Sequence, residues 1–187
     1  MNIILFGPPG AGKGTQAKYL VDKLNSVQIS TGEILRKEIQ KNSEIGKSII
    51  NEMNDGQFVS DEIVNNLIRD IVFNPSNKNR LIFDGYPRSI SQAKNLDLIL
   101  GNSNQKIDFI FFLNVNKKTI IERINKRKII ENRSDDELNT ILKRYDTYME
   151  TTRPVLDFYS KNPEFYEIDG SLKIEEITTK IEAFINV

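Results

Sequence analysis

The chain has 187 residues, of which 39% are hydrophobic and 28% charged, and its 26 basic side chains balance 26 acidic ones. This length suits one domain with a sizeable core, and the balanced charge argues against disorder and against bulk electrostatic binding of nucleic acid or anionic membranes. The absence of cysteine and histidine excludes disulfides, Cys/His zinc sites, thiol nucleophiles and histidine-based triads.

The N-terminal segment and the apolar runs carry no export or membrane signal. Met1–Gly7 has no basic n-region and too brief an apolar run for a signal peptide. Phe109–Leu113, the longest apolar run near the C-terminal half, is far too short to span a bilayer. We therefore expect a soluble cytoplasmic protein.

Short apolar runs alternate with helical patterns along the chain. The runs indicate five buried parallel strands, at Ile3–Phe6, Val27–Ile29, Leu81–Phe83, Phe109–Leu113 and Phe165–Ile168. Apolar residues at helical spacing form stripes over Ala17–Leu24, Ile63–Ile71, Leu138–Met149 and Ile174–Ile185. This alternation predicts right-handed crossovers. The expected fold class is α/β, a parallel five-stranded sheet flanked by helices.

One segment departs from the alternation. Residues Ser30 to Val59 are mostly helical in pattern and contain no strand, although they lie between two predicted strands. Thirty residues exceed a minimal crossover, which favours a small helical subdomain mounted on the sheet. Capping-box spacing in Ser30-x-x-Glu33 and Ser134-x-x-Glu137 predicts two helix starts.

A glycine-rich turn joins the first strand to the first helix. It reads Gly-Pro-Pro-Gly-Ala-Gly-Lys-Gly-Thr over residues 7–15. Strand, glycine turn and helix N-terminus form the context of a phosphate-binding loop, because glycines let backbone N–H groups approach phosphate oxygens and the helix dipole adds positive charge. Lys13 supplies a mobile charge for the outer phosphates. The alternative is a turn that serves only helix–strand packing.

The loop departs from the general pattern G-x-x-x-x-G-K-[ST]. Gly14 stands where a magnesium-binding hydroxyl is usual, and Thr15 comes one residue later. A metal ion would therefore depend more on phosphate oxygens, water and another protein group. Asp84 ends a predicted strand, and the carboxyl ends of adjacent parallel strands share a crevice. It is the candidate for holding magnesium, directly or through water; the alternative is a helix or turn cap.

Six arginines are candidates for phosphate binding, because the planar guanidinium binds phosphate bidentately and stays charged. Two of them, Arg123 and Arg127, are four residues apart on a predicted helix and share a face. For any single arginine the alternative is a solvated surface charge. The six are Arg36, Arg88, Arg123, Arg127, Arg133 and Arg144.

Taken together, these motifs resemble those of nucleoside monophosphate kinases, and most closely those of adenylate kinases. The likeness runs from Met1 to about Tyr159, with a weaker match at Ile168-Asp169-Gly170. The combination of these motifs is specific to the family, whereas no single one of them is. The motifs occur in the family's order: the residue 7–15 loop, Ser30-Thr31-Gly32 with Arg36, Asp84-Gly85-Tyr86-Pro87-Arg88, and Arg133-x-Asp135-Asp136.

The resemblance implies a P-loop NTPase-type fold and the reaction MgATP + AMP = 2 ADP by in-line phosphoryl transfer. It implies a single kinase domain over residues 1–187, with a core of 1–29, 60–125 and 134–187, an NMP-binding region of 30–59 and a lid of about 126–132. The lid is the short form, because only residues 128–132 separate Arg127 from Arg133. The implied partners are ATP, AMP and ADP, with Mg²⁺ and without zinc, for a monomer that binds neither nucleic acid nor membrane.

The resemblance also implies site residues. The implied ATP ligands are Gly10, Ala11, Gly12, Lys13, Gly14, Thr15, Arg127 and the backbone of Leu172. The implied AMP ligands are Thr31, Arg36, Gln57, Phe58, Val59, Gly85, Tyr86, Pro87, Arg88, Gln92, Arg133 and Arg144. The implied catalytic charges are Lys13, Arg88, Arg123, Arg133 and Arg144. The chain has Lys126 before Arg127, where the family usually has glycine.

This chemistry needs charge neutralisation and positioning rather than a general base, because a phosphate acceptor is already anionic. Lys13 and the six arginines supply seven positive charges, against about four negative charges on ATP and AMP with one magnesium. We therefore expect the empty protein to open and both nucleotides together to close it, which would exclude water as a competing acceptor.

Three other functions stay open. UMP/CMP kinases tend to have Ala at the position of Thr31 and Asn at that of Ser89; here Thr31 and Gln92 favour adenine. A GTP-dependent switch is suggested by Asn116-Lys117-Lys118-Thr119, which nearly matches N-K-x-D but lacks the aspartate. A non-catalytic nucleotide-binding module is the third, and the full arginine set weighs against it.

Overall fold

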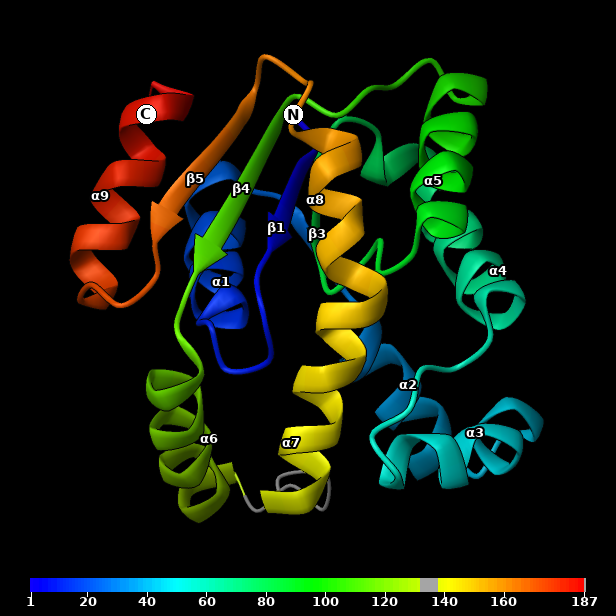
Figure 1. Ribbon diagram of the computed structural model, residues 1–187. Helices are drawn as coiled ribbons and strands as arrows, with labels where there is room; N and C mark the ends of the chain where they lie inside the picture. The colour runs from blue at the N-terminus through cyan, green and yellow to red at the C-terminus, as the bar shows by residue number, and fades with distance from the viewer. Residues whose placement is uncertain (132–137, 187) are drawn as a thin grey trace.

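The computed structural model describes residues 1–131 and 138–186 (Figure 1). Its centre is a parallel sheet with the strand order β2-β3-β1-β4-β5. The strands are β1 Ile3–Phe6, β2 Val27–Ser30, β3 Leu81–Asp84, β4 Phe109–Asn114 and β5 Phe165–Asp169. All five predicted strands are thus confirmed. Each begins at the predicted residue; β1 also ends where predicted, and the other four end one residue later.

The described α-helices are α1 Lys13–Leu24, α2 Thr31–Gln40, α3 Glu44–Asn54, α4 Asp61–Val72, α5 Ile90–Asn102, α6 Lys117–Glu131, α7 Leu138–Thr147, α8 Arg153–Tyr159 and α9 Ile174–Ile185. Helices α1, α4, α7 and α9 coincide with the four predicted apolar stripes, whereas no stripe was predicted for α5 or α8. A π-helical turn, Tyr148–Thr152, joins α7 to α8, and a 3₁₀ turn occupies Pro75–Asn77. Across the described parts of the chain, none of the helices is long and apolar enough to cross a membrane.

Strand β1 is buried on both faces, which explains its uninterrupted apolar sequence. Ile4 and Phe6 contribute to one hydrophobic cluster, which includes side chains of α4, α5 and α8. Ile3 and Leu5 contribute to a second cluster, with α1, α6 and α9. The period of two residues along a strand thus divides the core into a layer on each side of the sheet (Figure 1).

The strand order brings the carboxyl end of β1 beside the carboxyl end of β3. β1 pairs with β3 on one side and with β4 on the other, so that Leu5 lies opposite both Asp84 and Phe111. The helix that follows β1 and the helix that follows β3 pack on opposite faces of the sheet, as α1 and α5. At such a point a crevice is expected beyond the carboxyl ends of the two strands. The glycine-rich turn after β1 and the Asp84–Arg88 segment after β3 meet at this edge of the sheet.

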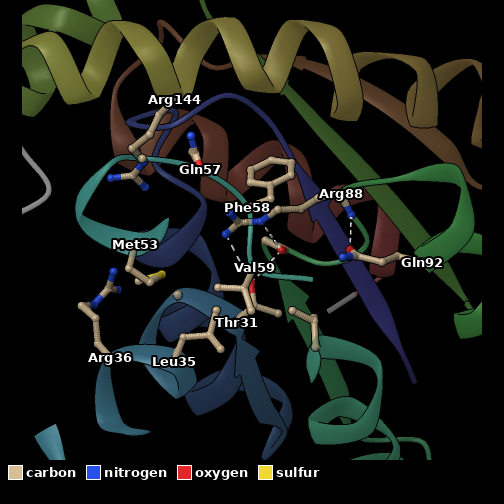
Figure 2. Close-up of a pocket in the computed structure, with 14 residues that line it drawn as sticks. Thr31, Leu35, Arg36, Met53, Gln57, Phe58, Val59, Arg88, Gln92 and Arg144 are labelled. Atoms are coloured by element: carbon tan, nitrogen blue, oxygen red, sulfur yellow. Dashed lines mark hydrogen bonds between the residues drawn. The ribbon is translucent and has the colours of Figure 1, made fainter. Parts of the chain in front are cut away.

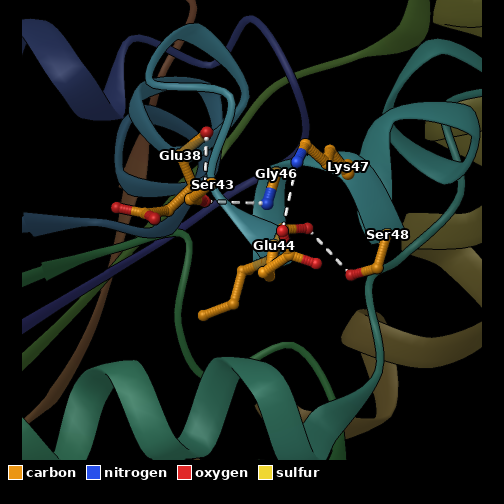
Figure 3. A network of polar contacts seen from close by, with 7 residues as sticks. Glu38, Ser43, Glu44, Gly46, Lys47 and Ser48 are labelled. Atoms are coloured by element: carbon orange, nitrogen blue, oxygen red, sulfur yellow. Dashed lines mark hydrogen bonds and ion pairs between the residues drawn. The ribbon is translucent and has the colours of Figure 1, made fainter.

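The segment after β2 is helical, as predicted, and consists of α2 and α3. The two helices pack closely where α3 begins: Ser43 accepts a hydrogen bond from Gly46 N (3.0 Å), and its hydroxyl donates to the Glu38 carbonyl of α2 (3.2 Å; Figure 3). A Cβ atom on Gly46 would lie 2.2 Å from that carbonyl oxygen. Glycine is therefore the residue that allows α2 and α3 this separation.

The helix start predicted at Ser30 is confirmed, because α2 begins at Thr31, but the expected capping hydrogen bond is not formed. Ser30 is also the last residue of β2, paired with Asp84 of β3, so sheet geometry sets its backbone. The second predicted box, Ser134 to Glu137, lies outside the described residues.

Candidate functional site

The glycine-rich turn wraps around the N-terminus of α1. Gly7 passes so close to β4 that a Cβ atom there would lie 2.8 Å from the Leu113 carbonyl oxygen. Gly12, which precedes α1, has a φ of 97° and no atom within 4 Å of where its Cβ would be. The turn therefore leaves the space beside Gly12 open at a helix N-terminus, where backbone N–H groups and the helix dipole favour an anion.

Two cationic side chains lie on this turn. The Lys13 ammonium donates to the carbonyls of Gly7 (2.8 Å) and Pro8 (3.0 Å), so its side chain curls back over the turn. Arg123 of α6 donates from Nη1 to the Ala11 carbonyl at 3.3 Å. Helix α6 thus packs directly against the turn, and two of the predicted catalytic charges, Lys13 and Arg123, both contact it.

Asp84 faces the same turn from the end of β3. Its Oδ2 atom would lie 3.5 Å from a Cβ on Gly14 and accepts a hydrogen bond from Gln28 Nε2 at 3.1 Å. Among the described residues there is no group of three or more acidic side chains that would cage a metal ion. One carboxylate nevertheless fits magnesium, which commonly binds through one or two carboxylates together with substrate phosphates and water.

A pocket lies on the other side of the Asp84–Arg88 segment, between α2, the stretch after α3, the start of α5 and α7 (Figure 2). The predicted AMP ligands that line it are Thr31, Arg36, Gln57, Phe58, Val59, Gly85, Arg88, Gln92 and Arg144. Five further residues line the pocket without having been predicted as ligands: Gly32, Leu35, Met53, Gly56 and Val64. Except for Gly32, which the Ser-Thr-Gly motif includes, these carry no signal of their own because apolar residues and glycines also serve packing.

Several contacts hold the Arg88 side chain at the wall of this pocket. Its Nε donates to the Gly85 carbonyl (2.6 Å), and its Nη2 lies 3.2 Å from the Thr31 hydroxyl. The guanidinium carbon lies 5.1 Å from the centre of the Phe58 ring, in a cation–π contact. The backbone is held as well, since the Arg88 carbonyl accepts from Thr152 Oγ1 of the π-helical turn at 3.0 Å. The planar cation is therefore preorganised at the pocket wall.

Tyr86 and Pro87 are not among the residues that line the pocket. The Tyr86 side chain is 1% exposed, lies in the core between α4 and α5, and donates its hydroxyl to Asn65 Oδ1 at 2.7 Å. Burial raises the pKa of Tyr86 to about 12. The contribution of Tyr86 is therefore to anchor the Gly85–Arg88 segment in the core rather than to reach into the pocket.

The other residues singled out in the sequence are Leu172, Arg127, Arg133 and Asn116. Leu172 follows β5 and packs against the hydrophobic cluster that contains α1 and α9. The side chains of Arg127 and Arg133 are outside the described part of the structure. Asn116, the residue that suggested guanine recognition, accepts a hydrogen bond from the Thr119 backbone N–H at 2.9 Å and so caps α6. This gives the asparagine a structural role without guanine.

Comparison with known proteins places this geometry in a family. The family model described as adenylate kinase matches residues 5–164. An adenylate kinase of Pelagibacter ubique is 46% identical over 213 aligned residues, covering 100% of both chains. One from Mycoplasma capricolum subsp. capricolum is 38% identical, also over 100% of both chains, and one from Caulobacter sp. strain K31 is 41% identical over 100% of this chain and 99% of the relative. The chain therefore belongs to the adenylate kinase family and is a nucleoside monophosphate kinase, a phosphotransferase.

Proposed function

We propose that this enzyme transfers the terminal phosphoryl group of MgATP to AMP, reversibly, to give two ADP. The observation that carries the proposal is that two consecutive residues at the end of β3 face two different sites. Asp84 faces the first turn of α1, beside the glycine-rich turn, and Gly85 lines the pocket that Arg88 borders. A donor triphosphate on the glycine-rich turn and an acceptor monophosphate in the pocket would thus bring their phosphates together at this edge.

The roles of the cations follow from their positions. Lys13 and Arg123 lie on the glycine-rich turn and would neutralise donor phosphates, whereas Arg36, Arg88 and Arg144 line the acceptor pocket. Guanidinium groups aimed at equatorial oxygens stabilise the charge that spreads over a metaphosphate-like transition state. The anionic acceptor is its own nucleophile, so the reaction proceeds without a histidine base.

Other parts of the proposal rest on the family resemblance. Arg127 and the Leu172 backbone would complete the ATP site, and Arg133 would join Arg144 at the transferred group. Magnesium bound with ATP would neutralise phosphate charge, with Asp84 as the protein group that would hold it through water. We further propose a cytoplasmic monomer with residues 30–59 as the NMP-binding region and about 126–132 as a short lid.

An acceptor panel tests the function. With MgATP as donor, we expect AMP to give rapid ADP formation in a coupled assay and UMP and CMP to be much poorer acceptors. A faster rate with UMP or CMP would instead identify a pyrimidine nucleotide kinase. Tight GTP binding without monophosphate-dependent turnover would support a switch protein, and nucleotide binding without any turnover would support a non-catalytic module.

Closure of residues 30–59 over the core can be tested by measuring the distance between two labels attached to the protein. Two cations about 6 Å apart repel by roughly 3 kcal/mol at an effective dielectric constant of 20, so we expect the protein to open without nucleotides. Because the chain has no cysteine, the exposed positions Ile50 on α3 and Leu98 on α5 can be changed to cysteine and labelled specifically. The 50–98 distance should shorten only when both nucleotides bind, whereas a control pair at Leu98 and the exposed Phe184 of α9 should not change. A short 50–98 distance without nucleotides would contradict the expectation.

A further inference from the structure

Gln92, in the first turn of α5, has an amide whose orientation the protein determines. The side chain lines the acceptor pocket and is 3% exposed. Its Oε1 accepts from the backbone N–H of Arg88 at 2.7 Å (Figure 2), and its Nε2 donates to Asp61 Oδ1 at 2.6 Å. A backbone N–H can only donate, and a carboxylate accepts. The amide oxygen must therefore face Arg88, and the amide nitrogen must face Asp61.

Asp61 is itself held in place. It is the first residue of α4, and its second oxygen accepts from the Ser89 hydroxyl at 2.8 Å. That hydroxyl caps α5 by accepting from the Gln92 backbone N–H at 3.1 Å. The carboxylate thus joins the N-termini of α4 and α5, and the geometry of both helices fixes the point toward which the Gln92 nitrogen is drawn.

The hydrogen-bonding capacity left on Gln92 is one donor and one acceptor. A primary amide has two N–H groups and two acceptor lone pairs, and these contacts use one of each. The pair that remains matches an amino group beside an unprotonated ring nitrogen, as on adenine, which glutamine can bind bidentately. Hypoxanthine presents the reverse order, an acceptor oxygen beside a ring N–H.

Binding the reversed edge in the same pose would require the amide to flip. The flipped NH₂ group would face the Arg88 N–H, and the flipped oxygen would face the Asp61 carboxylate. A donor would then face a donor at Arg88, and an acceptor would face an acceptor at Asp61. Hydrogen bonds to charged groups are among the more costly ones to lose. A site with fixed polar groups can reject a mismatched analogue far more strongly than an apolar pocket can.

We propose that Asp61 is a specificity-determining positioning residue, which fixes the Gln92 amide so that the enzyme selects acceptor bases with an amino group beside a ring nitrogen acceptor. This inference rests on the proposed function, since it needs the acceptor base to meet Gln92. Cytosine has the same donor–acceptor order as adenine, so Asp61 selects against IMP and leaves the choice between AMP and CMP to the shape of the pocket.

The test compares kcat/KM for AMP, IMP and CMP in the full-length enzyme. In Asp61→Ala and Asp61→Ser, the side chain no longer reaches Gln92, and the AMP:IMP ratio should fall by about tenfold. The AMP:CMP ratio should stay within about twofold, because both bases need the same amide orientation. Asp61→Asn keeps the size of the side chain, but its amide can turn the NH₂ group toward a flipped Gln92 oxygen while its own oxygen accepts from Ser89. The AMP:IMP ratio should therefore fall in this variant as well. Glu62→Ala removes a neighbouring, exposed first-turn acid of α4 and should leave both ratios unchanged.

Dissociation constants for AMP, IMP and CMP, measured by calorimetry, give the same comparison if a variant turns over slowly. An AMP:IMP ratio that stays at the wild-type value in Asp61→Ala and Asp61→Ser would overturn the proposal. So would an equal fall in the AMP:IMP and AMP:CMP ratios, which would indicate general damage to the pocket. A wild-type AMP:IMP ratio in Asp61→Asn would also overturn it, because an acceptor-only carboxylate would then not be what fixes the Gln92 amide. A wild-type enzyme that fails to phosphorylate AMP would instead overturn the proposed function. The wild-type assay is therefore done first, before any variant is compared.

Discussion

Replacement of Arg88 by alanine is expected to lower kcat by about a thousandfold, because arginines that neutralise a transferring phosphoryl group contribute on this scale. The guanidinium is already oriented by Gly85, Thr31 and the Phe58 ring. Little reorganisation is therefore needed when charge develops, which is the condition under which such a group is most effective. Steady-state rates with saturating MgATP and AMP measure the effect.

The control for this variant is Arg80→Ala. Arg80 precedes β3, whereas Arg88 follows it, so the two arginines lie at opposite ends of one strand. Arg80 donates to the Asn25 carbonyl at 2.7 Å on the exposed side of the molecule, and its loss should leave kcat within about twofold. Arg88→Lys keeps the charge without the planar fork and should fall between wild type and alanine. A near-wild-type kcat for Arg88→Ala would remove this residue from the catalytic set.

Replacement of Gly46 by alanine is expected to lower the free energy of unfolding by about 3 kcal/mol, the upper part of the range for overpacking. The new methyl group would lie 2.2 Å from the Glu38 carbonyl oxygen and 2.8 Å from Ile39 Cα. Both obstacles are backbone atoms of α2, so no side-chain rotation can relieve the contact (Figure 3). Helices α2 and α3 would have to separate, and urea titration followed by circular dichroism would measure the loss.

Gly101→Ala is the matched control, because Gly101 is also a helical glycine, in α5. A Cβ there would meet no atom within 4 Å, so the substitution removes the helix-propensity cost of glycine and should stabilise the fold by about 0.5–1 kcal/mol. The same chemical change is thus expected to have opposite signs at the two positions. Equal effects at both positions would show that the approach of α2 to α3 is not what requires glycine at 46.

The strands and the glycine-rich turn could be predicted from the sequence because their signals are local. Ile3–Phe6 is apolar at every position, as a strand buried on two faces requires, and the following glycines need no partner to be recognised. Most predicted acceptor ligands line one pocket, since strand order brings the ends of β2 and β3 together at the edge where Ser30 pairs with Asp84. Their roles in binding and catalysis stay predictions that the variants above test.

Side-chain direction is what the spacing along the chain left undetermined at Ser30 and Tyr86. Ser30 has capping-box spacing but makes no capping bond, because it also ends a strand. Tyr86 lies within the recognised motif, yet its side chain packs into the core. Spacing along the chain identifies which residues are near one another, but backbone direction at that point decides which way each side chain extends.

Contacts between residues far apart in the chain were decided by tertiary packing alone. Thr152 reaches the Arg88 carbonyl across 64 positions, and Gln92 reaches Asp61 across 31. Neither Thr152 nor Asp61 lies in a sequence motif that predicts such a bond, because hydroxyl and carboxylate groups occur throughout the chain. Periodicity and turn residues determine local structure over a few residues, whereas these hydrogen bonds exist only because packed helices hold their partners within 3 Å.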